Sequence, residues 1–86
     1  MAASIKLIAG VREVLAAVAS YLPHDVANAH DLLDHNEWGA ALSLICTQLF
    51  EYDVTVSADV YAQIARLARD MELPEGEWAF ISKLVE

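Results

Sequence analysis

Apolar residues recur at helical spacing along the whole chain, and this periodicity constrains the fold more than any other feature of the sequence. In the first quarter, the steps between apolar residues are three and four, the period of one face of an α-helix. The residues of this stripe are Ile5, Ile8, Val11, Leu15, Val18 and Leu22. The sequence therefore predicts a first helix that reaches Pro23, because proline either ends a helix or opens the next one.

A second, shorter helix is expected over residues 24–33, with Val26, Ala29 (or His30) and Leu33 facing inward. Asn36 is the expected N-cap of a third helix, since asparagine side chains accept hydrogen bonds from the free amides of a first turn. Glu37 would then lie in that first turn, where its charge complements the helix dipole.

The third predicted helix, residues 37–51, is the most apolar element. So broad an apolar face indicates a central helix that touches several neighbours at once. Trp38 is expected to pack in the core, and Gly39 to let helices approach closely. The main stripe is Trp38, Leu42, Ile45, Leu49 and Tyr52, widened by Ala41, Cys46 and Phe50.

The last third of the chain adds one long helix and one short one. Val54-Thr55-Val56 is β-prone but too short to make a sheet alone, so an extended connection is expected. Ser57 is the predicted N-cap of a fourth helix, and a closing helix is expected over residues 77–85. Two sets of residues should face inward: Val60, Ile64, Leu67 and Met71 in the fourth helix, and Trp78, Ile81, Leu84 and Val85 in the closing helix. We predict an all-α fold, a compact single-domain bundle over residues 1–86 with four main helices plus a short C-terminal helix.

The middle of the chain carries only acidic charge. No lysine or arginine occurs between Glu13 and Arg66, and 13 acids against 5 bases give a formal net charge of -8. Such a segment builds a negative potential that repels nucleic acid and membrane surfaces and attracts basic proteins. We therefore predict a basic macromolecular partner. The acids of this window are Asp25, Asp31, Asp34, Glu37, Glu51, Asp53 and Asp59.

The sequence also bears on compartment. Cys46 is the only cysteine, so no intramolecular disulfide can form, which favours a reducing environment. Arg12 and Glu13 interrupt the apolar start before it could act as a signal peptide, and no stretch approaches the roughly 18 apolar residues of a membrane span. We expect a soluble, cytoplasmic protein.

Residues with catalytic or metal-binding chemistry have simpler interpretations here. His30 and Asp34, four residues apart on a helix, could hold a metal, but a third ligand would have to come from His24. Cys46 falls in the most apolar helix, where burial would raise its pKa and core packing is favoured over nucleophilic chemistry. The glycines are isolated, so there is no phosphate loop. We predict no enzymatic activity, no metal and no cofactor.

One further alternative concerns small acidic helical domains in general. Acyl carrier proteins are of this size and charge, and they carry phosphopantetheine on a serine at a helix start, usually in an Asp-Ser-Leu motif. The candidate here is Ser57-Ala58-Asp59, which lacks that pattern. This interpretation is therefore set aside.

The segment Phe50-Glu51-Tyr52-Asp53 points to a protein interface. Acids at a helix C-terminus oppose the dipole, so Glu51 and Asp53 are not placed to stabilise the helix. Tyrosine is a frequent interface anchor because it joins an apolar ring to a polar tip. The alternative is that Tyr52 belongs to the core and the acids are merely solvated.

A family resemblance covers the same region, roughly residues 31–73. The run from His35 to Leu42, the segment Leu44-Ile45-Cys46-Thr47-Gln48-Leu49 and the pair Glu51-Tyr52 resemble the MafI family of bacterial immunity proteins. In that family a Glu-Trp-Gly turn leads into a Leu-Cys-x-Gln-Leu helix, a Glu-Tyr pair and a short extended segment before a Ser-capped helix. Met71-Glu72-Leu73 also fits. Ile45 before the cysteine and the Ala-rich first helix are mild departures.

The resemblance implies an antitoxin that binds the C-terminal toxin domain of a secreted polymorphic or contact-dependent toxin. Such toxins are often nucleases, which tend to be basic because they hold phosphate. The residues expected to contact the toxin are Asp31, Asp34, Glu37, Glu51, Tyr52, Asp53 and Asp59, with Asp25 merely solvated. The alternative is a non-catalytic helical interaction or regulatory module that forms a homodimer through its apolar surplus.

Overall fold

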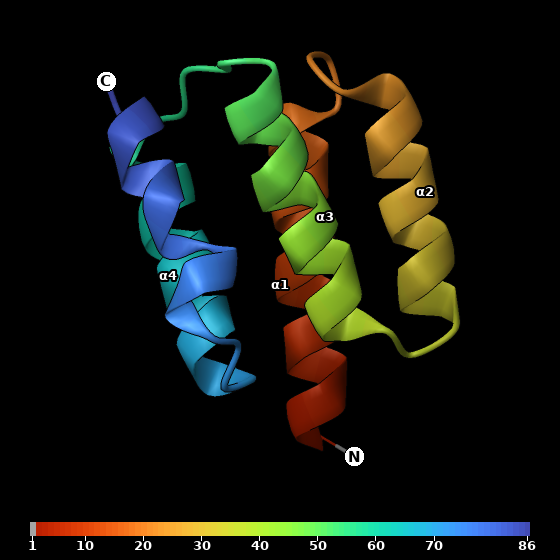
Figure 1. Ribbon diagram of the computed structural model, residues 1–86. Helices are drawn as coiled ribbons and strands as arrows, with labels where there is room; N and C mark the ends of the chain where they lie inside the picture. Colours follow the sequence, from red (N-terminus) through yellow and green to blue (C-terminus); the bar gives the residue numbers. More distant parts are fainter. Residues whose placement is uncertain (1) are drawn as a thin grey trace.

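Over the part of the chain that the structure describes, the elements are four α-helices and two short 3-10 helices (Figure 1). The computed structural model describes residues 2–86, with side chains described from residue 5 onward. The elements are α1 (Ala2–Val18), α2 (Pro23–Asp34), α3 (Trp38–Glu51), α4 (Ala58–Asp70), η1 (Glu75–Glu77) and η2 (Ala79–Leu84). The predicted all-α architecture is confirmed. Within the described residues, the only extended pairing is an isolated parallel bridge between Val56 and Val85.

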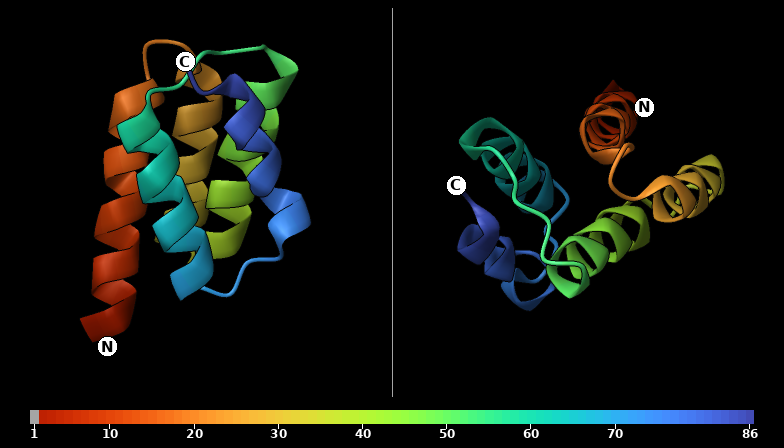
Figure 2. Two further views of the ribbon diagram at one scale, coloured as in Figure 1. Left: turned by 90° about the vertical axis from the view of Figure 1, so that its left-hand side faces the viewer. Right: turned by 90° about the horizontal axis from the view of Figure 1, so that it is seen from above.

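The helices run alternately up and down, and α3 lies at the centre (Figures 1 and 2). It contacts α1, α2, α4 and both 3-10 helices, as its broad apolar face predicted. Because α2 and α3 are antiparallel, the end of α2 meets the start of α3 at one end of the bundle. At the other end, the α1–α2 turn lies near the end of α3 and the start of α4.

One cluster of buried side chains receives residues from every α-helix and from the C-terminal segment. Most predicted inward residues lie in it, including Leu33 of α2 and Ile64 of α4. Ile5 is an exception at 67% exposure. The first turns of α1 extend beyond the other helices (Figure 2), in agreement with the exposure of Ile5. The buried members of the predicted first stripe are Val11, Leu15, Val18 and Leu22.

Two helix boundaries differ from the sequence prediction. The first helix ends at Val18, before the predicted Leu22, whereas Pro23 opens α2, one of its two expected roles, where its missing amide costs nothing. Asn36 is not an N-cap: its φ is 61°, and Glu37 occupies the cap position of α3 without a side-chain hydrogen bond to the helix. The predicted N-cap role of Ser57 is confirmed, because its Oγ accepts a hydrogen bond from the Val60 amide at 3.1 Å.

Three helices end in the same way, with a non-glycine residue in the left-handed region. Asn36, Asp53 and Glu72 have φ values of 61°, 53° and 57°. After α3, the Asp53 amide bonds the Phe50 carbonyl at 3.1 Å and the Val54 amide bonds the Leu49 carbonyl at 2.9 Å. This is the hydrogen-bond pattern of the Schellman motif, and it recurs after α2 and α4. Asparagine at this position therefore serves to end α2.

The predicted short closing helix over residues 77–85 is present as the two 3-10 helices η1 and η2. Trp78, Ile81 and Leu84 are buried at intervals of three, which is the repeat of a 3-10 helix, while Val85 is half-buried. The Val56 amide bonds the Leu84 carbonyl at 3.0 Å and the Glu86 amide bonds the Val56 carbonyl at 3.2 Å. These bonds tie the chain end to the extended segment between α3 and α4.

Two expectations for the start of α3 have different outcomes. The Trp38 ring packs against the core, half-buried, as predicted. Gly39 is not a close-approach position, because a Cβ atom built on it would lie 3.4 Å from Leu73 Cδ1, an ordinary contact. In the described part of the chain, no helix combines the length and the apolar character needed to cross a membrane.

Candidate protein-interaction surface

The end of α3 carries three exposed side chains that the sequence singled out. Glu51 is the last helical residue, Tyr52 is the C-cap and Asp53 is the left-handed residue that follows. Tyr52 is 64% exposed, so its predicted place on the core stripe is wrong. The Schellman bonds stop the helix here, and the ring stands at the surface beside two carboxylates.

Phe50, also expected on the inward face, lies at the border of this surface. It is 46% exposed, and its ring packs edge-on against Phe80 of η2, with ring centroids 5.3 Å apart and planes at 75°. This contact holds the last turn of α3 against the C-terminal segment. Phe50 therefore contributes to packing, and Tyr52 is the freer of the two aromatic residues.

The α1–α2 turn brings a second exposed tyrosine to the same end of the bundle. Tyr21 is 62% exposed and lines a hollow of about 240 Å³ together with Tyr52. The remaining lining residues are Leu22, Pro23, His24 and Asp25. We call this end, defined by Tyr21–Asp25, Glu51–Asp53 and Asp59, the tyrosine end.

Asp25 is more than a solvated acid, contrary to the expectation from sequence. It is half-buried, and its Oδ1 accepts a hydrogen bond from Gln48 Nε2 at 3.0 Å. As a first-turn acid it also complements the dipole of α2. The bond to Gln48 fixes the carboxylate at the wall of the hollow.

Neither Tyr21 nor Asp25 was identified as a site residue from sequence. Tyr21 does have a signal, since it falls off the apolar stripe that continues from Val18 to Leu22, two residues before a helix-opening proline. An aromatic ring in a turn and off the apolar stripe is not directed into the core, so it is expected at the surface. Its proximity to Tyr52, however, follows only from the packing of α1 and α2 against α3.

Asp59 lies in the first turn of α4, which begins at the tyrosine end (Figure 1). It is exposed, and its charge complements the helix dipole beside the Ser57 cap. Tyr21 also lines a second hollow, of about 150 Å³, together with Val56 and Ser57. Asp59 therefore has a structural role that does not depend on any partner.

The other three predicted acids lie at the opposite end of α3. Asp31, Asp34 and Glu37 are all exposed where α2 ends and α3 begins. The 14 residues of α3, at about 1.5 Å each, put this group about 20 Å from Glu51 and Asp53. The seven predicted residues are thus divided between the two ends of the bundle and do not form one continuous patch.

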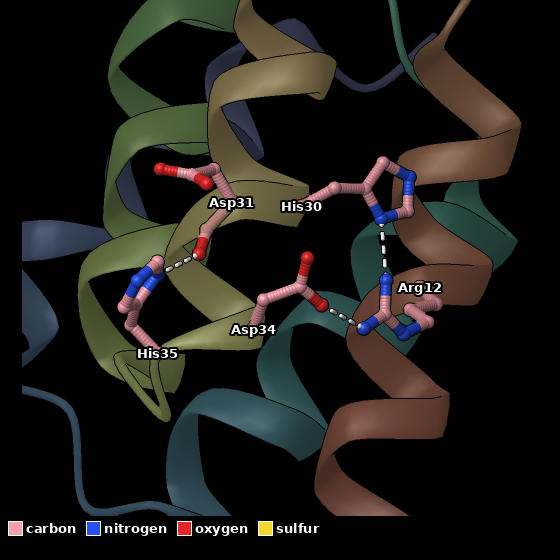
Figure 3. Close-up of polar contacts among 5 residues, drawn as sticks. All are labelled: Arg12, His30, Asp31, Asp34 and His35. Carbon is pink, nitrogen blue, oxygen red and sulfur yellow. Dashed lines mark hydrogen bonds and ion pairs between the residues drawn. The ribbon is translucent and has the colours of Figure 1, made fainter.

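A basic residue from outside the acidic window reaches this second group (Figure 3). Arg12 of α1 donates to Asp34 Oδ1 at 3.0 Å from one nitrogen, and its other terminal nitrogen lies 2.7 Å from His30 Nδ1. Since a guanidinium can only donate, His30 Nδ1 is the acceptor and its ring is neutral in this contact. The fold therefore pairs Asp34 with a cation that is distant in sequence.

His35 points elsewhere, toward its own helix (Figure 3). Its Nδ1 lies 2.8 Å from the Asp31 carbonyl oxygen. This hydrogen bond, followed by the charge of the Asp31 carboxylate, raises the pKa of His35 above its usual value. Among the described residues, no group of three or more histidine, cysteine, aspartate or glutamate side chains is placed to hold a metal ion.

Cys46 lies in the core, as expected. It is fully buried in α3, and desolvation raises the pKa of its thiol to about 12. The thiolate required of a nucleophile is thus strongly disfavoured.

Comparison with known proteins adds no identity. No protein-family model, no curated protein and no solved structure matches the chain. The case for function therefore rests on the surface itself. At the tyrosine end, two exposed rings stand among acids contributed by three helices and their connecting turns.

Proposed function

We propose that the protein is an immunity protein that binds and neutralises the C-terminal toxin domain of a cognate secreted bacterial toxin, most simply a basic nuclease. The observation that carries this proposal is the pairing of exposed Tyr21 and Tyr52 with carboxylates at one end of the bundle. Tyrosines supply contact area at low entropic cost, and acids supply complementarity to a basic partner. The protein would act as a binder and not as a catalyst, in the cytoplasm, where a nuclease meets its substrate.

Charge supports a basic partner more specifically. All residues of the tyrosine end fall in the stretch between Glu13 and Arg66 that contains no lysine or arginine. Long-range attraction between this surface and a nuclease cleft would speed the encounter, while the tyrosines would slow dissociation. Asp31, Asp34 and Glu37 lie about 20 Å away. They would add to the field, or contact the rim of a large toxin domain.

The direct test is co-expression with the toxin domain encoded next to this gene. Cells that make the toxin domain alone should die, and cells that also make this protein should survive. A purified pair should form a stable complex on size-exclusion chromatography. If the toxin kills equally well in the presence of this protein, the proposal is wrong.

A matched pair of charge reversals then locates the surface. Glu51→Lys should weaken toxin binding and reduce its dependence on salt, and a lysine at a helix C-terminus should not harm folding. Glu75→Lys makes the same change in net charge in η1, outside the tyrosine end. Equal losses of affinity in the two variants would mean that the net charge of the whole protein, and not contacts at the tyrosine end, determines toxin binding.

Exposed Ile5 favours the second candidate, a helical module that forms a homodimer. Its side chain is 67% exposed on a part of α1 that extends beyond the bundle. Sedimentation equilibrium of the wild type and Ile5→Lys separates the two proposals. A dimer that dissociates in Ile5→Lys, without binding to any toxin domain, supports the second candidate, and a monomer opposes it.

A further inference from the structure

The hollow at the tyrosine end has the composition of a site for a cationic side chain. It is an open hollow of about 240 Å³, and two tyrosines, one histidine, one aspartate, one leucine and one proline line it. None of these residues is a lysine or an arginine, so His24 is the one lining residue that could carry a competing positive charge. Aromatic faces attract cations through their quadrupole, most strongly when a carboxylate lies beside them.

The carboxylate of the hollow is held in position before any partner arrives. Gln48 Nε2 donates to Asp25 Oδ1 at 3.0 Å across the interface of α2 and α3, in a part-buried contact. A carboxylate offers about four acceptor positions, and the amide of Gln48 uses one. Asp25 can therefore accept further hydrogen bonds from a donor in the hollow without rearrangement, which lowers the entropic cost of binding.

The two tyrosines supply faces on which a planar group can stack. Tyr21 comes from the α1–α2 turn and Tyr52 from the cap of α3, and both are more than half exposed. Each tyrosine side chain has only two rotatable bonds, so ordering its ring on a partner costs little conformational entropy. A guanidinium suits such a site better than an ammonium, because it is planar, weakly hydrated and able to donate several hydrogen bonds at once.

We propose that this hollow binds the guanidinium group of an arginine side chain on the partner protein. The group would stack on Tyr21 and Tyr52 and donate hydrogen bonds to the Asp25 carboxylate. This inference rests on the proposed function for the nature of the partner, a basic protein, and it names the residue type that the tyrosine end recognises. The cation site can nevertheless be tested with the full chain alone.

The test is an NMR titration of the ¹⁵N-labelled full chain with N-acetyl-arginine amide, at pH 8, where imidazoles are in general uncharged. Saturable shifts are expected at the amides of Tyr21, Asp25 and Tyr52, with a dissociation constant on the order of millimolar, as for a single exposed contact. N-acetyl-lysine amide should bind several-fold more weakly. Sodium chloride at equal ionic strength controls for general screening.

Three variants assign the shifts to the hollow. Asp25→Asn keeps an acceptor for Gln48 but removes the charge, and should weaken arginine binding about fivefold. Tyr52→Ala should weaken it about two- to fivefold through loss of one aromatic face. Asp70→Asn makes the same chemical change as Asp25→Asn at the far end of α4 and should leave binding unchanged.

Each outcome bears on the inference. Absence of saturable shifts, shifts spread evenly over all acids, or equal affinity for lysine amide would overturn the guanidinium site. Arginine binding without any toxin complex would leave the site standing and remove the proposed function. A toxin complex whose affinity is unchanged in Asp25→Asn and Tyr52→Ala would keep the proposed function and remove the guanidinium site.

Discussion

Gly10 of α1 and Leu67 of α4 lie so close together that a Cβ atom on Gly10 would fall 2.5 Å from Leu67 Cδ2. Leu67 is itself buried, and it lines a hollow of about 590 Å³ together with Gly10, so its δ-methyl groups would have to turn toward that hollow to make room. The absence of a side chain at Gly10 thus sets how closely α1 and α4 approach. This is the role that the sequence suggested for Gly39.

The first prediction follows from this contact. Gly10→Ala gains about 1 kcal/mol of helix propensity but overpacks the α1–α4 contact at a cost of about 1–3 kcal/mol. We expect a net loss of about 1 kcal/mol in the free energy of unfolding, measured by urea denaturation. Gly39→Ala is the control, because its Cβ would meet only an ordinary 3.4 Å contact, and it should be neutral or stabilising. A stable Gly10→Ala protein would show that Leu67 can rotate away.

The left-handed residue after α4 gives the second prediction. Glu72 has φ 57°, which disfavours a residue with a Cβ atom, and glycine is the usual occupant of this position. Glu72→Gly should stabilise the protein by about 0.5–1 kcal/mol after allowance for the added entropy of the unfolded chain. Asn36→Gly is the comparison, and its gain should be smaller because asparagine tolerates this conformation. Destabilisation in Glu72→Gly would mean that the Glu72 side chain makes a compensating contact.

Helix positions could be predicted from the sequence because apolar spacing reports which face is buried. Leu33, Ile45 and Ile64 are inward in both prediction and structure. The prediction is wrong, or leaves the helix type open, at positions where the local backbone conformation, and not burial, determines the structure. Asn36 suits both an N-cap and a left-handed residue, and only its neighbours' hydrogen bonds show which applies. The closing helix was predicted correctly, but the run from Trp78 to Leu84 is so short that its spacing fits both helical periods and does not distinguish a 3-10 helix from an α-helix.

The candidate surface could be predicted only in part. Glu51, Tyr52 and Asp53 are adjacent in sequence, so their position after an apolar helix was visible. Tyr21 joins them through tertiary packing, which leaves no trace in local spacing. The contact of Arg12 with Asp34 could not be predicted either, because the two residues are 22 positions apart and only tertiary packing brings them together.

The third prediction concerns pH. The hydrogen bond to the Asp31 carbonyl and the nearby carboxylates raise the pKa of His35 in the folded state. A raised pKa means that the protonated ring favours the folded state. Its contribution is present below the unfolded value of about 6.5 and is lost as pH rises through the folded value. NMR titration of His35 should give a midpoint above 6.5. His35→Asn should remove this part of the pH dependence of stability, and an unshifted midpoint would contradict the contact.

The fourth prediction uses Cys46 as a probe of opening. Burial raises the pKa of its thiol to about 12, and the side chain is inaccessible. The native protein at pH 8 should resist iodoacetamide, whereas protein in urea should be alkylated at one site. Mass spectrometry counts the adducts. Because modification requires opening of the core, its rate should be faster in Gly10→Ala than in wild type. Fast labelling of the wild type would show that the core around α3 opens readily.

The fifth prediction concerns the contact of Arg12 with two groups on α2. Its side chain is 41% exposed and that of Asp34 is 63% exposed, so solvent screens this ion pair. A double-mutant cycle of Arg12→Ala with Asp34→Ala should give a coupling energy below about 1 kcal/mol that decreases with salt. The cycle with His30→Ala should depend less on salt, because a neutral ring accepts that hydrogen bond.

Arg12→Lys should recover at most one of the two contacts, since a single ammonium cannot reproduce two separate nitrogens. Full recovery by lysine, measured as unfolding free energy, would mean that charge alone joins α1 to α2 and that the forked geometry of Arg12 contributes nothing.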